Sequence, residues 1–210
     1  MNRALRRRAI LLAFVGALIS GFAIIPALNS PWRDALREVV GFRRVELYEE
    51  ELRSAASEQE LEPALLAAVV YVESTGRLGV VSGAGAMGLM QLMPAAASDS
   101  SKALGMPTPS AEMLLNDAEL NIRLGARHLA WTLKAEGGDL ERALVAYNAG
   151  RAKLARWIED AGSYALWRER TLARGDNSTL QYARRVFAYR DLFRERALFR
   201  QDSTTQTLIK

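Results

Sequence analysis

The segment from Ala64 to Ser74, ALLAAVVYVES, is apolar on nearly every side and carries a single charge, Glu73. Pro63 stands before it and suits the first turn of a helix, and Gly76 stands after it and can end one. A helix that is apolar all round has to be enclosed by other elements, because it has no face to present to water. The segment therefore predicts a helix at the centre of a globular domain.

Glu73 lies on one stripe of this expected helix with Val70, Val69 and Leu66. A carboxyl group drawn into apolar surroundings has a raised pKa and tends to keep its proton. A glutamic acid that is protonated near neutral pH is suited to general-acid catalysis. The alternative is a glutamate at a helix end whose side chain turns out to water, and periodicity alone supports the two interpretations equally.

The rest of the chain also has helical periodicity. Helical spacing is found over residues 34–60 with a break at Gly41, and over residues 88–92, 94–103, 117–136 and 139–147. Asp139 is placed to cap the last of these, and Gly150 to close it. A final helix carries an apolar seam formed by Thr179, Tyr182, Val186, Tyr189 and Phe193. We therefore expect an all-α fold.

The composition excludes several kinds of site. The 210 residues include no cysteine and one histidine, His128, which argues against thiolate or histidine metal centres and against a Ser-His-Asp triad. We expect neither a metal nor a cofactor. The net charge is +4, with arginine crowded between Arg142 and Arg200. Solvated helix faces explain these arginines better than a polyanionic partner, and nucleic acid ranks last because no basic-aromatic motif accompanies them.

The N-terminus has the pattern of a membrane anchor. A cluster of arginines, Arg3 and Arg6 to Arg8, precedes an uncharged apolar run from Ala9 to Leu28. A run of this length suffices to cross a bilayer, and the arginines favour a cytoplasmic N-terminus with the remainder on the far side. Cleavage near Gly21-Phe22-Ala23 as a signal peptide is the alternative. The expected organisation is an anchor over residues 1–32, one domain over 33–200 and a polar tail over 201–210.

Three groups of residues follow one another along the chain in a characteristic order. The first is Glu73-Ser74, then Ser82, Gly85-Ala86-x-Gly88-Leu89-Met90-Gln91 and Met93-Pro94; the second is Asn121-Ile122 with Gly125 and Leu129; the third is Ala146-Tyr147-Asn148-Ala149-Gly150. With these intervals, residues 46–193 resemble the soluble-type (SLT) lytic transglycosylases of the lysozyme-like superfamily.

The resemblance implies a helical, lysozyme-like (goose-type/SLT) domain that cleaves the glycan strands of peptidoglycan. Together with the anchor pattern of the N-terminus, we expect this domain in the periplasm, anchored in the bacterial inner membrane, or secreted if the leader is cleaved. The resemblance does not indicate a protein partner. It implies that Glu73 is the catalytic acid and base. The substrate-binding residues that it implies are Ser82, Met90, Gln91, Tyr147, Asn148 and Tyr182.

The residues themselves leave other roles open, and three positions depart from the family pattern. Met90, Tyr147 and Tyr182 could be core residues, and Asn148 could serve the end of its helix. Family members usually have an aromatic residue at position 76, often a glutamate at 178 and often a tyrosine at 128, where this chain has Gly76, Ser178 and His128. These departures concern substrate positioning more than the type of reaction.

A single carboxylate suits this family's reaction. Between Ser74 and Ser98 the chain has no second acid, whereas most glycosidases use two. In a lytic transglycosylase the nucleophile is the substrate's own C6 hydroxyl, so one residue can act first as acid and then as base, and the product carries a 1,6-anhydro end. A hydrolytic muramidase on the same fold, with a distant acid such as Asp117, and a non-catalytic wall-binding scaffold are the alternatives.

Overall fold

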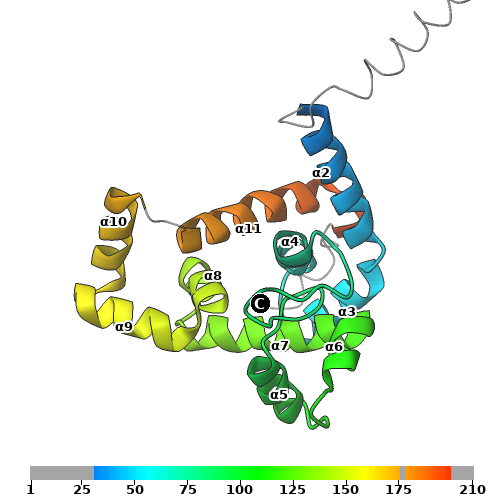
Figure 1. Ribbon diagram of the computed structural model, residues 1–210, viewed down its shortest axis with the longest axis horizontal. Helices are drawn as coiled ribbons and strands as arrows, with labels where there is room; N and C mark the ends of the chain where they lie inside the picture. The colour runs from blue at the N-terminus through cyan, green and yellow to red at the C-terminus, as the bar shows by residue number, and fades with distance from the viewer. Residues whose placement is uncertain (1–30, 176–177, 200–210) are drawn as a thin grey trace, which may run out of the picture. The chain divides into compact units, whose positions relative to one another are not determined.

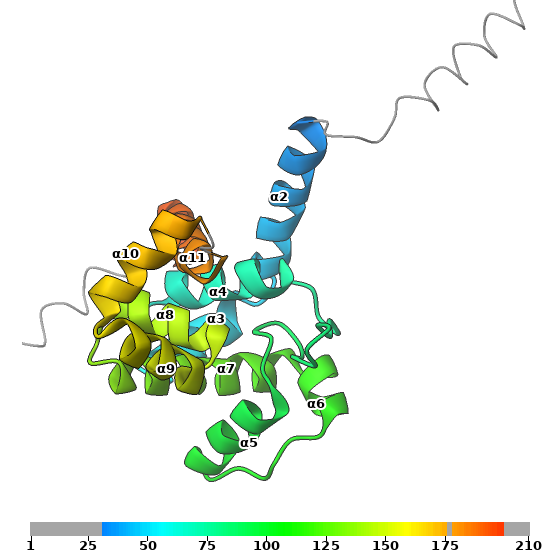
Figure 2. The ribbon, with the colours of Figure 1, turned by 60° about the vertical axis from the view of Figure 1, so that its left-hand side comes forward.

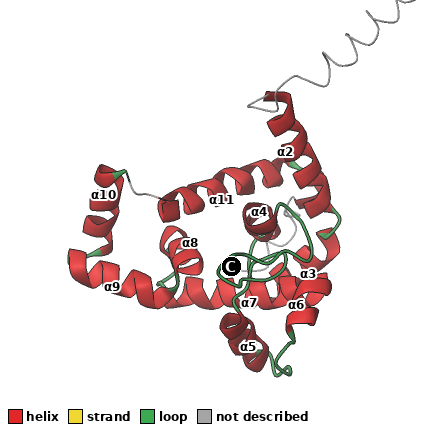
Figure 3. Ribbon diagram, viewed as in Figure 1, coloured by secondary structure: helices red, strands yellow, loops and turns green. Residues whose placement is uncertain are grey.

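The computed structural model describes residues 31–175 and 178–199. The described residues form helices joined by loops, with no strand among them (Figure 3), which confirms the all-α expectation for this part of the chain. The chain divides into two units, residues 1–39 and 40–210, and apart from the first turns of α2 everything described below belongs to the second. The helices are α2 (Pro31–Glu46), α3 (Glu49–Glu58), α4 (Pro63–Ser74), α5 (Pro94–Ala103), α6 (Ala111–Asn116), α7 (Ala118–Ala135), α8 (Leu140–Ala149), α9 (Arg151–Ala161), α10 (Tyr164–Arg174) and α11 (Ser178–Glu195), followed by a 3-10 turn, η1 (Ala197–Phe199).

Helix α4 is enclosed as its composition predicts. Every residue from Ala64 to Tyr71 is buried. Helix α4 packs against α11 and α3, and α8 lies between α11 and α7 and contacts both (Figures 1 and 2). Pro63 begins the helix, and Thr75 ends it in the left-handed conformation, with its N–H bonded to the carbonyl of Tyr71. The central position of α4 decides where its last residues lie.

Gly41 does not act as the sequence predicts. The break expected at Gly41 is absent, because α2 runs through it and ends at Glu46. A Cβ at Gly41 would lie 2.5 Å from Cγ2 of Thr75, so this glycine permits close packing of α2 on the end of α4. At Gly76 a Cβ would lie 2.7 Å from Cβ of Arg44. The space that an aromatic residue at position 76 would need is therefore filled by α2.

The helix expected over residues 88–92 is wrong. These residues form turns and two isolated bridges, Val81 with Met87 and Met87 with Leu92. Gly88 and Gln91 have φ angles of 78° and 47°, which no right-handed helix contains. Helices α6, α9 and α10 were not predicted, while α5, α7, α8 and α11 confirm the remaining expectations. Asp139 caps α8 by accepting a hydrogen bond from the N–H of Arg142.

A buried asparagine holds this irregular loop in place. Asn121, on α7, is fully buried. Its Oδ1 accepts from the N–H of Met90 at 2.9 Å, and its Nδ2 donates to the carbonyls of Leu114 at 2.9 Å and Met87 at 3.1 Å. A Cβ at Gly88 would lie 2.1 Å from that Nδ2. The loop can therefore reach α7 only where residue 88 is glycine.

None of the helices within the described ranges combines the length and the apolar character needed to cross a membrane. The predicted anchor segment, Ala9 to Leu28, and the tail over residues 201–210 lie outside the described residues.

Two glycines of the loop allow a matched test of this packing. Gly85 and Gly88 both have positive φ, but a Cβ at Gly85 meets nothing within 4 Å. Gly85→Ala should cost about 1 kcal/mol of unfolding free energy for the backbone conformation alone. Gly88→Ala should cost about 3 kcal/mol, because the contacts of Asn121 must also break. Urea unfolding measures both, and equal losses would contradict the assignment.

Candidate active site

Glu73 and Tyr182 meet across the interface of α4 and α11. Glu73 is the residue before the last of α4, and its side chain is partly buried. The hydroxyl of the buried Tyr182 donates a hydrogen bond of 2.7 Å to Oε1 of Glu73. The two residues are 109 positions apart in the chain. The apolar seam of α11 turns Tyr182 inward, so the packing that buries α11 also brings this hydroxyl to the carboxyl group.

Burial raises the pKa of Glu73 to about 7, although the hydrogen bond from Tyr182 and the positive charge of the exposed Arg185 both act to lower it. Loss of hydration disfavours the ionised carboxylate, and here it outweighs the two groups that favour ionisation. The causes of the shift include no second carboxylate among the described residues. A carboxyl group with this pKa exchanges its proton readily near neutral pH, so it can serve as acid or as base.

Tyr147 lies beside the same carboxyl group but has a different hydrogen-bond partner. Its hydroxyl donates to the carbonyl of Met90 at 2.8 Å, which ties α8 to the loop. Burial raises the pKa of Tyr147 well above its usual range, and the charge of Glu73 raises it further. The pKa of Tyr182 is raised by the same two causes. Both tyrosines are therefore neutral hydrogen-bond donors at any pH near neutrality.

Met90 is fully buried, and its side chain packs on α7. A Cβ at Gly125 would lie 2.3 Å from the Met90 sulfur, so the glycine makes room for this side chain. Its N–H and carbonyl are bonded to Asn121 and Tyr147. Met90 therefore contributes its backbone to the site, and helices α7 and α8 hold this backbone in place.

Gln91 and Ser82 are both used to shape the loop. Nε2 of Gln91 donates to the carbonyls of Gly88 at 2.9 Å and Val80 at 3.1 Å. The hydroxyl of Ser82 accepts from the N–H of Ala86 at 2.9 Å. A positive φ at a residue with a side chain, as at Gln91, is uncommon and is maintained only where surrounding contacts require it. These two side chains make the loop rigid where it passes α4.

The remaining sequence-predicted positions are less closely connected with Glu73. Asn148 is exposed near the end of α8. His128 packs against Tyr147 with ring centroids 5.3 Å apart, and burial lowers its pKa. Asp117 is occupied as the N-cap of α7, where its side chain accepts from the N–H of Leu120. Among the described residues, no group of three or more His, Cys, Asp or Glu side chains could hold a metal ion.

Asn121 is the residue that site reasoning from the sequence missed. It was visible as part of a motif, but nothing in its spacing reveals the three bonds that it makes to the loop. The available signal is a polar residue on the apolar stripe of α7, between Ala118 and Ile122. A buried side-chain amide has to find partners, and here those partners are the backbone of the site loop.

Comparison with known proteins agrees with this geometry. The family model of the transglycosylase SLT domain matches residues 50–169, more than half of the chain. A transglycosylase of Enterobacteria phage PRD1 is 40% identical over 115 residues, which is 55% of this chain and 39% of the phage protein. The soluble lytic murein transglycosylase of Escherichia coli K12 is 31% identical over 111 residues, covering 53% of this chain and 17% of that protein.

Among solved structures, an inactive glutamate-to-glutamine mutant of the lytic transglycosylase Slt from Pseudomonas aeruginosa is similar, with a TM-score of 0.60 and 30% identity. The match covers 70% of this chain and 24% of that one. The chain thus spans well under half the length of these relatives. Because the family model covers more than half of the sequence and includes Glu73 and Tyr147, the chain belongs to the transglycosylase SLT domain family.

Proposed function

We propose that the protein is a peptidoglycan lytic transglycosylase and that Glu73 is its catalytic residue. The observation that carries the proposal is a carboxyl group with a pKa of about 7 that accepts a hydrogen bond from Tyr182. Relatives named as transglycosylases support the reaction class. The inactive mutant of the Pseudomonas enzyme, in which a glutamate is replaced by glutamine, supports a glutamate as the essential group.

The proposed reaction needs a residue that first donates a proton to the substrate and then accepts one from it. Protonated Glu73 donates its proton to the glycosidic oxygen between N-acetylmuramic acid and N-acetylglucosamine, and the bond between this oxygen and C1 of the muramic acid breaks. The N-acetyl group of the muramic acid steadies the positive charge that develops on C1. Glu73, now ionised, takes the proton of the C6 hydroxyl, whose oxygen bonds to C1 and forms the 1,6-anhydro ring. A pKa of Glu73 near the working pH serves both steps, because the protonated and the ionised carboxyl group are then both well populated.

The surrounding groups suit this double role. The hydroxyl of Tyr182 stabilises the ionised carboxylate that exists between the two steps, since its hydrogen bond lowers the pKa of Glu73. Tyr147 holds the carbonyl of Met90, and Gln91 and Ser82 keep the loop rigid. We assign these four residues to shaping the substrate site, and the exposed Asn148 to its wall. A carboxyl group held in place beforehand avoids reorganisation during the reaction.

We also propose that residues 1–32 anchor the domain to the outer face of the bacterial inner membrane, where peptidoglycan lies. The arginines before Ala9 and the apolar run to Leu28 support this placement. The domain proper then begins near Arg33, and the polar residues after Gln201 form its tail.

The role of Glu73 is tested by the exchange Glu73→Gln, which keeps the shape of the side chain and the acceptor for Tyr182. Loss of the proton donor should reduce the rate of release of anhydro-muropeptides by at least about a thousandfold. Mass analysis of digested peptidoglycan reports the products, and circular dichroism confirms that the variant is folded. Products with reducing ends from the parent protein would indicate a hydrolase, and full activity of the variant would exclude Glu73 as the acid.

The hydrogen bond of Tyr182 predicts a shift in the pH profile. Activity of the parent should fall as pH rises through about 7, because Glu73 then loses the proton that it must donate. In Tyr182→Phe a group that lowers this pKa is removed, so the alkaline limb of kcat/KM should move up by about one pH unit. Tyr189→Phe, on the same helix, should leave the limb in place. A limb that stays or moves down in Tyr182→Phe would refute the assignment.

The anchor can be tested separately from the chemistry. Expressed in a bacterium, the full chain should sediment with the inner membrane, and a chain lacking residues 1–32 should remain soluble, because the apolar run supplies the binding. Fractionation followed by immunoblotting measures this. If the full chain is recovered in the soluble periplasmic fraction with a shortened N-terminus, the segment is a cleaved signal peptide instead.

A further inference from the structure

Glu136 is a buried carboxylate at the end of α7. Its side chain is 8% exposed, and each of its oxygens accepts a hydrogen bond from a different arginine. Oε2 accepts from Nη2 of Arg142 at 3.0 Å, and Oε1 accepts from Nε of Arg151 at 3.0 Å. Arg142 lies in the first turn of α8, and Arg151 is the first residue of α9. One carboxylate therefore binds three successive helices together.

All three charges lie at the helix ends that disfavour them. A negative charge is unfavourable at the C-terminal end of a helix, and a positive charge is unfavourable at the N-terminal end. Glu136 is the C-cap of α7, whereas Arg142 and Arg151 lie in the first turns of α8 and α9. Nε of Arg142 is also buried and has no hydrogen-bond partner within the described residues. The stability of the separate helices therefore does not explain these residues, whereas their contacts across helices do.

The ion pairs reach both ends of α8. Arg142 is the third residue of this helix, and Arg151 comes two positions after its last residue, Ala149. Between them, apolar side chains of small or medium size are buried, namely Ala143, Leu144, Val145 and Ala146. Apolar contacts are non-directional, so they set the depth of α8 in the domain more closely than its position along its own axis. Charge-assisted hydrogen bonds have a defined direction, and here they fix that position.

A second series of contacts leads from Arg151 to Tyr147. The guanidinium group of Arg151 lies 4.9 Å from the ring centroid of Trp131. Trp131 stacks on His128 with centroids 5.7 Å apart, and His128 packs against Tyr147 at 5.3 Å. The hydroxyl of Tyr147 donates to the carbonyl of Met90 in the loop. A shift of Arg151 would therefore disturb the packing of the Tyr147 ring as well as the end of its helix.

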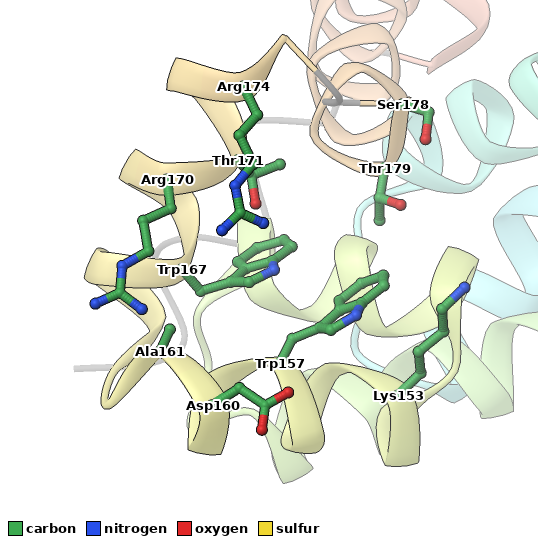
Figure 4. Close-up of a pocket in the computed structure, with 10 residues that line it drawn as sticks. All are labelled: Lys153, Trp157, Asp160, Ala161, Trp167, Arg170, Thr171, Arg174, Ser178 and Thr179. Carbon is green, nitrogen blue, oxygen red and sulfur yellow. The ribbon is translucent and has the colours of Figure 1, made fainter.

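The helices that follow Arg151 leave a space on one side. The tryptophan pocket, with a volume of about 440 Å³, lies between α9, α10 and the beginning of α11, where Thr179 lines it. Trp157, on α9, and Trp167, on α10, form one wall, and their stacked rings have centroids 5.4 Å apart (Figure 4). Because this space separates α9 and α10 from part of α11, the attachment of α9 depends more strongly on the contacts near Arg151.

We propose that Glu136 is a positioning residue for the reaction. By holding its two arginines it fixes α8, so that Tyr147 keeps its hydrogen bond to the loop beside Glu73. The inference rests on the proposed function, since it concerns the rate of the reaction at Glu73. Buried ion pairs often contribute little net stability, and their best-supported use is to select one arrangement of packed elements.

A double-mutant cycle tests the proposal in the full chain. Glu136→Gln keeps the shape of the side chain and removes its charge, so its bonds to the arginines weaken. The value of kcat/KM for release of anhydro-muropeptides should fall about tenfold, because a small misplacement of the groups that shape a site slows the reaction. Tyr147→Phe removes the hydrogen bond to the loop, and in that background Glu136→Gln should change kcat/KM by less than about twofold. Substitutions at distant, independent sites are additive, so this coupling is specific to positioning through Tyr147.

The matched control is Glu58→Gln. Glu58 binds Arg123 through two hydrogen bonds of 2.8 Å, which join α3 to α7, so this variant should leave kcat/KM unchanged in both backgrounds. Arg151→Gln breaks one of the bonds of Glu136 from an exposed residue and should lower kcat/KM in the same direction, so it replaces Glu136→Gln in the cycle if that variant does not fold. Urea unfolding and circular dichroism report folding. Equal losses in the parent and in the Tyr147→Phe background, or no loss in either, would overturn the proposal.

A measurement that needs no activity separates this inference from the proposed function. In protein labelled with 3-fluorotyrosine, the fluorine NMR signal of Tyr147 is identified by its absence in Tyr147→Phe. This signal should move in Glu136→Gln and stay in place in Glu58→Gln. If the parent releases no anhydro products but the signal moves, the proposed function fails and the positioning of Tyr147 by Glu136 is retained. A signal that stays in place in Glu136→Gln refutes the positioning, with or without activity.

Discussion

The desolvation of one carboxyl group is the constraint on which the site depends. Helix α4 is apolar on every side, so it can only lie at the centre of the domain, and it carries Glu73 with it. The cost of burying this group appears as a pKa of about 7. Tyr182 and Arg185 offset part of that cost, and they leave the carboxyl group balanced between its two protonation states near neutral pH.

Polar contacts, together with the buried side chains of Leu89, Met90 and Leu92, hold the loop that faces α4. Asn121 binds it from α7 and Tyr147 binds it from α8, while Gln91 and Ser82 close it from within. Such bonds have directions, so they fix the position of backbone atoms more closely than apolar contacts do. Helices α7 and α8 thereby hold the loop, which is distant from them in sequence, in one position beside Glu73. At Gly76, helix α2 fills the space that an aromatic side chain would need.

Helices α8 and α11 connect the reaction site to its surroundings. Helix α11 supplies Tyr182 to Glu73 and, one turn earlier, Thr179 to the tryptophan pocket. Helix α8 supplies Tyr147 to the loop and Glu141 to α10. The same two helices therefore connect Glu73 with the pocket that Trp157 and Trp167 line.

The sequence alone determined that the described part of the chain is helical and that α4 is central, because both follow from local composition and periodicity. Glu73 was singled out by the family resemblance, since periodicity supported a buried and a solvent-facing side chain equally. The reasoning from local patterns also predicted a helix over residues 88–92 that does not exist and placed a break at Gly41 inside a continuous helix. Both errors come from glycine, whose role depends on what lies opposite it. Only the tertiary structure decided that Tyr182 meets Glu73, that Asn121 holds the loop and that two tryptophans form a pocket, since each joins residues brought together by packing and no local pattern encodes that packing.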